Sequence, residues 1–165
     1  MRRHKNLIAF TLTVVATILV DQLSKLWIIS TLAPGQTFRL LPGLDITHVK
    51  NSGAAFGLFS RYSPVIFWVS LVVVAVALVW LLKSPSAKQM GMPVYVAVGL
   101  ITGGALANNL IDRVFRGTVV DYIDVHWWPV FNFADVAIVV GVIIVVLSVF
   151  VSMRSGAQDK EAQGG

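Results

Sequence analysis

The chain of 165 residues contains no cysteine. This absence excludes disulfide bonds, thiolate metal sites and a cysteine nucleophile. Charged side chains are also scarce, at 13% of residues, whereas 56% of residues are hydrophobic and the mean hydropathy is +0.79. A soluble domain of this length needs more polar residues to cover its surface, so the composition indicates a membrane protein.

Acidic residues are the rarest charged type. Of the eight, Asp159 and Glu161 lie near the end of the chain, and the other six are all aspartate, at positions 21, 45, 112, 121, 124 and 135. The net charge of +5 would suit a nucleic-acid ligand, but the basic residues are scattered singly between apolar runs. That pattern is typical of charge beside membrane spans, and we expect no nucleic-acid partner.

Four apolar stretches are long enough to cross a bilayer, which takes roughly 20 residues per helix. The first follows a basic leader, as in a signal peptide, but it has no small-residue cleavage site and carries Asp21 and Lys25 late in the run. We therefore expect a retained helix in one membrane domain over residues 1–165, with a disordered tail at 155–165. The predicted spans are residues 7–29, 64–82, 93–111 and 134–152.

Basic residues near the ends of the spans predict the orientation of the chain. Seven of the thirteen lie beside the termini and the second loop, which places both termini in the cytoplasm. The six aspartates outside the tail then lie in the outer third of the membrane or outside it. Residues 30–63 include alternating segments bounded by Pro-Gly turns, which predict short strands. The predicted fold is mainly α, with four transmembrane helices and a small extracytoplasmic β platform.

Asp121 and Asp135 form the first candidate site. Both belong to the segment between the third and fourth spans, so their carboxylates should lie at similar depth. Two carboxylates in a low-dielectric site cannot both ionise cheaply, so one can activate a water while the other protonates a carbonyl or amine. In the alternative interpretation, Asp135 is a first-turn helix acid capped by Asn132. The cost of carboxylates at membrane depth favours the functional interpretation.

Asp112 is a rival for this pair. It directly precedes Arg113 and lies three residues after Asn109, on the same helical face. An adjacent arginine would keep Asp112 ionised, so we interpret it as a structural ion pair that braces the site. Asp124 would share a face with Asp121 on a helix and is an alternative member of the pair. A solvated acid beside the nearby histidine is the favoured interpretation of Asp124.

Two further motifs supply polar side chains. "DQLSK" places Asp21 and Lys25 four residues apart on one helix face, which predicts an ion pair with the lysine reaching outward. Ser24 points about 100° away from the lysine on a helix, which disfavours a Ser–Lys catalytic pair. "NSGAAFG", residues 51–57, is either a tight turn or a close backbone approach in which Asn51 positions substrate. The three histidines are too dispersed for a zinc site, and we expect no metal.

Together these stretches resemble one family. "DQLSK", "NSGAAFG", "GGALANNLIDR", "GTVVDYIDVHWWP" and "FNFAD" occur in the order seen in the lipoprotein signal peptidases, the bacterial type II signal peptidases. The resemblance covers almost the whole chain. It implies an intramembrane aspartyl protease that removes the signal peptide of a prolipoprotein just before a diacylglyceryl-modified cysteine. It also implies an inner-membrane location with the site at the outer face, no cofactor, a monomer among membrane lipids, and inhibition by globomycin-type peptides.

The resemblance also assigns residues. It matches Asp121 and Asp135 to the catalytic aspartates of the family. It matches the supporting polar residues to Asp21, Asn51, Asn109, Asp112, Arg113 and Asn132, and the "DQLSK" block adds Lys25.

The chain departs from the family pattern at two places. Ala107 and two successive asparagines stand where the family commonly has Gly-Asn, so a local shift would make Asn108 the functional residue instead of Asn109. Asp124 stands where the family often has an apolar residue. The alternatives from other classes are a small proton-coupled transporter that relays protons through interfacial aspartates, and a non-catalytic membrane scaffold.

Overall fold

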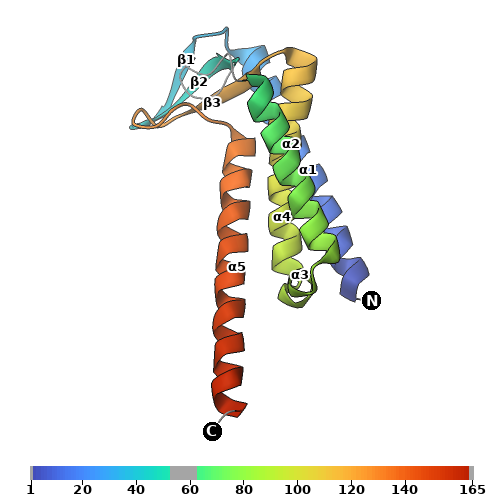
Figure 1. The fold of residues 1–165 in the computed structure, drawn as a ribbon. Coiled ribbons are helices and arrows are strands. Elements are labelled where there is room, and N and C mark those ends of the chain that lie inside the picture. The colour runs from blue at the N-terminus through green and yellow to red at the C-terminus, as the bar shows by residue number, and fades with distance from the viewer. Residues whose placement is uncertain (1, 53–62, 164–165) are drawn as a thin grey trace.

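The computed structural model describes residues 2–52 and 63–163. Helices dominate, and a small sheet lies at one end of them (Figure 1). The elements in chain order are α1 (Arg2–Thr31), β1 (Thr37–Leu41), β2 (Leu44–Asn51), α2 (Ser63–Lys83), α3 (Pro85–Met90), α4 (Met92–Ala105), the π-helix η2 (Leu106–Arg116), β3 (Val119–Asp124) and α5 (Phe133–Gln163).

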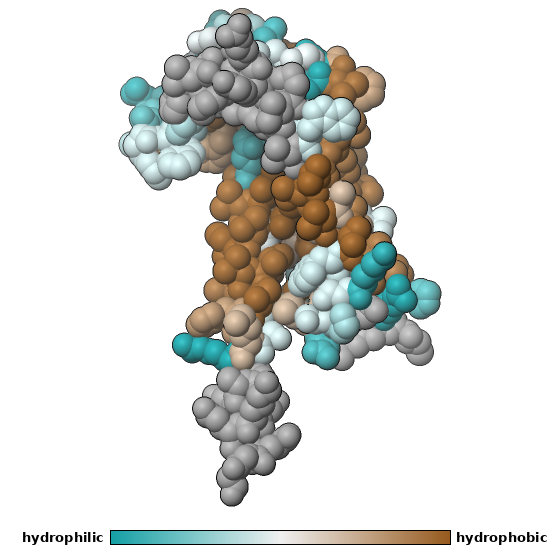
Figure 2. All heavy atoms as spheres, viewed as in Figure 1, coloured by the Kyte–Doolittle hydropathy of each residue, from teal (hydrophilic) through white to brown (hydrophobic). Residues whose placement is uncertain are grey.

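The predicted fold class, mainly helical with a small sheet, is confirmed. Within the described part of the chain, three helices are long and apolar enough to cross a membrane: Arg3–Thr31, Met92–Arg116 and Phe133–Arg154. The helix α2 lies where the second span was predicted, but its apolar stretch among the described residues, Leu71–Lys83, is shorter than the other three, so this span stays a prediction. Figure 2 shows hydrophobic residues covering the middle of the helices and hydrophilic residues gathered towards both ends, as a membrane protein requires.

The helix α4 lies between α1 and α5, and glycines allow all three backbones to approach closely (Figure 1). A Cβ added to Gly104 would lie 2.5 Å from the carbonyl oxygen of Ala134, and one added to Gly141 would lie 2.6 Å from that of Ala97. Small residues at such contacts are how membrane helices pack without a hydrophobic driving force. The contact at Gly104 fixes the first turn of α5.

The sheet is antiparallel with the order β1-β2-β3. The two strands predicted within residues 30–63 are confirmed, whereas β3 was not predicted. It pairs with β2 so that Asp121 lies opposite Val49, and Val120 and Tyr122 pack against Ile28 near the end of α1. Because β3 is a strand, side chains three residues apart point to opposite faces. The condition under which Asp121 and Asp124 would share a face, a helix over both residues, is therefore not met.

The C-terminal helix is longer than predicted. We expected a disordered tail at residues 155–165, but α5 continues to Gln163. Most residues after the apolar run, among them Met, Arg, Ala, Gln, Lys and Glu, have high helix propensity, which explains the continuation. The first helix likewise starts before the predicted span, at Arg2.

A substitution at Gly104 tests the close packing of α4 and α5. We expect Gly104→Ala to lower the free energy of unfolding by about 1–3 kcal/mol, because the added methyl forces the backbones apart. Thermal unfolding in detergent measures this loss. Leu147→Ala, which trims a lipid-facing side chain that is 57% exposed, serves as the control. Equal melting temperatures for Gly104→Ala and the unaltered protein would contradict the packing described here.

Candidate active site

Asp121 and Asp135 come together at one residue, Asn132. The Asn132 side chain donates from Nδ2 to Oδ1 of Asp121 over 2.7 Å, and its backbone N–H donates to Oδ2 of Asp135 over 3.1 Å. Asp121 comes from β3 and Asp135 from the first turn of α5. The structure therefore brings the two carboxylates together at one end of the spans, as the sequence predicted.

Asn132 also caps the helix, as the alternative interpretation expected. Its Oδ1 accepts a hydrogen bond of 3.0 Å from the backbone N–H of Asp135. Together with the bond from its own N–H to the Asp135 carboxylate, this gives the reciprocal pattern of a capping box. Helix capping and convergence with Asp121 are compatible, because the same residue, Asn132, serves both.

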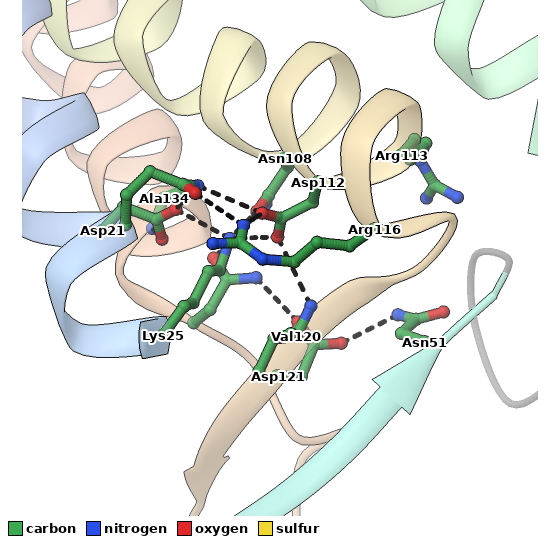
Figure 3. A network of polar contacts seen from close by, with 12 residues as sticks. Asp21, Lys25, Asn51, Asn108, Asp112, Arg113, Arg116, Val120, Asp121 and Ala134 are labelled. Atoms are coloured by element: carbon green, nitrogen blue, oxygen red, sulfur yellow. Dashed lines mark hydrogen bonds and ion pairs between the residues drawn. The ribbon is translucent and has the colours of Figure 1, made fainter. Parts of the chain in front are cut away.

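Asp121 is buried, with 3% of its surface exposed. Its Oδ2 accepts a hydrogen bond of 2.8 Å from Nδ2 of Asn51 on β2, which Figure 3 shows reaching across from the neighbouring strand. Burial raises the pKa of Asp121 above the ordinary value of 3.8, and the amides of Asn51 and Asn132 act against that rise. A carboxyl group of this kind exchanges protons at a higher pH than a free aspartate does.

The Lys25 side chain is fully buried beside this pair. Its Nζ lies 2.7 Å from Oδ2 of Asp21 and 2.7 Å from Oδ2 of Asp112, and it donates to Oδ1 of Asn108 over 2.5 Å (Figure 3). The three acceptors match the three N–H donors of an ammonium group. The predicted ion pair with Asp21 is confirmed. The predicted outward course of the lysine is wrong, because these three buried acceptors hold it inside.

Asp112 braces the site as predicted, but with another arginine. Besides Lys25, its carboxylate pairs with Arg116 (Figure 3), whereas Nε of Arg113 donates to Oδ1 of Asn109 over 3.3 Å. Adjacent helical side chains point about 100° apart, and residues four apart share a face. The i, i+4 spacing of Asp112 and Arg116 was the sequence signal that would have identified Arg116.

Asn108 occupies the position expected for Asn109. Its Nδ2 donates to Oδ1 of Asp135 over 2.9 Å and to Oδ1 of Asn132 over 3.3 Å, while Asn109 contacts Arg113. Both asparagines lie in the π-helix η2, whose wider turns change the direction in which each side chain points. The assignment of Asn109 to the site is therefore corrected to Asn108, which was the open alternative.

Asp21 links α1 directly to the start of α5. Its Oδ1 accepts a hydrogen bond of 3.0 Å from the backbone N–H of Ala134, the residue before Asp135. Ser24 contacts the Tyr122 hydroxyl, at 2.7 Å, and donates to the carbonyl oxygen of Asp21. The hydroxyl of Ser24 thus bonds to partners other than Lys25. This agrees with the sequence argument against a Ser–Lys catalytic pair.

The remaining predicted residues lie away from the pair or outside the described residues. Asp124 accepts a hydrogen bond of 2.8 Å from the backbone N–H of His126, so its expected place beside the histidine is confirmed. Of the "NSGAAFG" stretch, only Asn51 and Ser52 fall within the described residues. In residues 2–52 and 63–163, no cluster of three or more His, Asp or Glu could hold a metal ion.

Fold and site together define a membrane protein in which a strand and a helix hold two carboxylates, one buried and one partly buried, at one end of the helices. The family model described as signal peptidase (SPase) II matches residues 13–151. A lipoprotein signal peptidase of Syntrophomonas wolfei is 41% identical over 80% of this chain and 86% of its own length. One of Caulobacter vibrioides is 43% identical over 88% of each chain.

Solved structures agree with these matches. A bacterial membrane enzyme determined by the in meso method at 2.3 Å resolution has a TM-score of 0.76 at 30% identity, covering 87% of this chain and 88% of that one. A second, at 1.9 Å resolution, has a TM-score of 0.74 at 32% identity, over 85% and 91%. The chain therefore belongs to the signal peptidase II family and is a membrane-bound peptidase.

Removal of the buried ammonium group tests its role in holding the site. Lys25→Met leaves two buried carboxylates, Asp21 and Asp112, without their shared partner. We expect a loss of about 3–5 kcal/mol in the free energy of unfolding, as for other broken buried ion pairs. Thermal unfolding measures it, with Lys83→Met, at an exposed position in the last turn of α2, as the matched control. Equal stability of the two variants would contradict the role assigned to Lys25.

Proposed function

We propose that the chain is an aspartic endopeptidase that removes the signal peptide from diacylglyceryl-modified prolipoproteins, cutting just before the lipidated cysteine. The observation that carries the proposal is the meeting of two carboxylates, Asp121 and Asp135, on the single residue Asn132. Family membership supports the substrate class, because the relatives are named lipoprotein signal peptidases.

Hydrolysis then follows from general acid–base chemistry. One carboxylate of the pair is ionised and takes a proton from a water molecule, whose oxygen attacks the scissile carbonyl carbon. The other carboxyl group protonates the developing oxyanion, and a proton then passes to the leaving amine. Neither a covalent intermediate nor a cofactor is needed. The two carboxylates interact, so their protons belong to one coupled titration.

The surrounding polar residues fix this chemistry in place. Asn108 and Asn132 donate to Asp135, and Asn51 and Asn132 donate to Asp121. Such donors hold each carboxylate in one orientation before substrate arrives, which is the basis of electrostatic preorganisation. The donors, and the helices that carry them, are held in place by a second group of polar residues: Asp21, Lys25, Asp112 and Arg116. Arg113 donates to Asn109, and its charge interacts with those of Asp121 and Asp135.

The location proposed for the protein is the bacterial inner membrane, with both termini in the cytoplasm and the site at the outer face. The protein acts as a monomer, with membrane lipids around it, and globomycin-type peptides would occupy the aspartate pair. The transporter alternative has less support, because α5 carries no charged residue between Asp135 and Arg154, and a proton relay would need acids near the middle of the membrane.

Substitution of either aspartate tests the proposal. We expect Asp121→Asn and Asp135→Asn each to lower the rate of prolipoprotein cleavage by about 10²–10⁴-fold, because each removes one proton-transfer group. The assay follows release of the signal peptide from a lipidated prolipoprotein by purified protein. Asp124→Asn, on the same strand as Asp121 but on its other face, is the matched control and should keep its rate. Retained activity in either first variant would remove that aspartate from the pair.

The pH dependence of the rate tests the donors. The amide of Asn51 favours the ionised form of Asp121, so its loss should raise the pKa of Asp121 further above 3.8. At low pH both carboxyl groups are protonated and the rate falls. In Asn51→Ala we therefore expect this acidic limb of the profile of kcat against pH to move to higher pH. An unchanged or opposite movement would show that Asn51 does not act on the ionisation of the pair.

A further inference from the structure

Gln22, the second residue of "DQLSK", is a half-buried polar side chain of α1 that takes no part in the proposed chemistry. Its amide nitrogen donates to Oδ2 of Asp21 and to Oδ1 of Asp112, over 3.1 Å in each case. Its carbonyl oxygen accepts a hydrogen bond of 2.5 Å from Nη1 of Arg116. The nitrogen and the oxygen of the amide are therefore both engaged, and each N–H group has a carboxylate to bond to.

The two carboxylates that Gln22 joins each hold the backbone beside one member of the aspartate pair. Oδ1 of Asp21 accepts a hydrogen bond of 3.0 Å from the N–H of Ala134, which directly precedes one of the two aspartates. Oδ2 of Asp112 accepts a hydrogen bond of 3.4 Å from the N–H of Val120, which directly precedes the other (Figure 3). The distance between these two carboxylates therefore affects how β3 and the first turn of α5 lie relative to each other.

Arg116 determines which way the amide of Gln22 points. Its Nη1 donates to the carbonyl oxygen of Gln22 and also pairs with Asp112. A guanidinium group has donors and no acceptor, so the amide nitrogen cannot face it. That nitrogen must therefore face the carboxylates, which only accept when they are ionised. The amide is held in this one orientation by residues of the chain itself.

Lys25 does not supply the same constraint. Its ammonium group is a point charge at the end of a flexible stem, so it neutralises Asp21 and Asp112 without fixing the distance between them. The amide of Gln22 is planar, and its two N–H groups point in fixed directions. Neighbouring residues on a helix point about 100° apart, which lets Asp21 bond to α5 while Gln22 bonds to η2. Lys25 thus contributes charge, and Gln22 contributes direction.

We propose that Gln22, oriented by Arg116, is a positioning residue for the cleavage reaction: its amide holds Asp21 and Asp112 at the separation that brings the aspartate pair together. The inference rests on the proposed function, because the reaction that Gln22 assists is prolipoprotein cleavage. Gln22 acts through these two carboxylates and the backbone that they hold, so its loss should slow the chemical step and leave substrate binding as it was.

Removal of the amide tests this role. Gln22→Met keeps the length of the side chain and removes its donors and its acceptor. A misplacement of about 1 Å can cost about 10²-fold in rate, and Lys25 still links the two carboxylates in this variant. We therefore expect kcat to fall about tenfold while KM stays within about twofold. Release of the signal peptide from a lipidated prolipoprotein, by purified protein in detergent, gives both constants.

A control that loses stability elsewhere separates positioning from packing. A Cβ added to Gly99 would lie 2.9 Å from Cβ of Thr13, eight residues before Asp21 on α1. Gly99→Ala should lower the melting temperature and keep kcat, with the assay run below both melting transitions. A fall of kcat in Gly99→Ala equal to that in Gln22→Met would show that lost stability alone explains the effect, and would overturn the role of Gln22.

A double-mutant cycle tests the orientation by Arg116. If the guanidinium group acts through the amide, Gln22→Met should lower kcat by a smaller factor in an Arg116→Met background than in the unaltered protein. Factors that multiply independently would overturn the part assigned to Arg116.

The remaining outcomes are equally decisive. An unchanged kcat in Gln22→Met overturns the inference, and so does a rise of KM at constant kcat, which would place Gln22 in substrate binding. Should Gln22→Met fail to give folded protein, Gln22→Asn takes its place with the same expectation, because a side chain one methylene shorter cannot keep both 3.1 Å bonds. Absence of cleavage by the unaltered protein refutes the proposed function and this role with it. Equal cleavage by the unaltered protein and Gln22→Met refutes the role of Gln22 alone.

Discussion

The buried ammonium group of Lys25 is the contact on which the rest of the site depends. It lies between the carboxylates of Asp21 and Asp112 and donates to the side-chain oxygen of Asn108. Because that oxygen is occupied, the amide nitrogen of Asn108 must face Asp135, to which it donates. Asp21 in turn holds the backbone of Ala134. The Lys25 cation thus links α1 and η2 directly, and it links α5 through Asp21. Without this cation the buried carboxylates of Asp21 and Asp112 would be left uncompensated, which is costly.

The site also requires that the strand β3 lies beside the first turn of the helix α5. Asp121 belongs to β3, whose Val120 and Tyr122 pack on α1, and Asp135 belongs to α5, whose backbone nearly touches α4 at Gly104. Neither element alone places two carboxylates together. Asn132, between them in the chain, donates to both. A peptidase of the signal peptidase II family can therefore place its carboxylate pair at one end of its spans with few polar residues.

Much of this architecture follows from the sequence, because apolar length and turn residues are local signals. They predicted the helices, the strands of residues 30–63 and the depth shared by Asp121 and Asp135. The strand β3 was missed, since six residues that pair with a distant strand carry little local signal. Asn108 was misassigned because the direction of its side chain depends on the π-helical phase of η2. Arg116 was overlooked although its i, i+4 spacing from Asp112 is a local signal. The inward course of Lys25 depends on partners 83 and 87 residues away along the chain, which no local pattern reveals.

The central claim is that Asp121 and Asp135 act on the same carbonyl group. A crystal structure of the protein with a lipidated peptide, in which a tetrahedral hydroxyl replaces the scissile carbonyl, tests it most directly. The account predicts that hydroxyl within about 2.6–3.2 Å of a carboxylate oxygen of both residues. A bound analogue whose hydroxyl contacts only one aspartate, or neither, would contradict it.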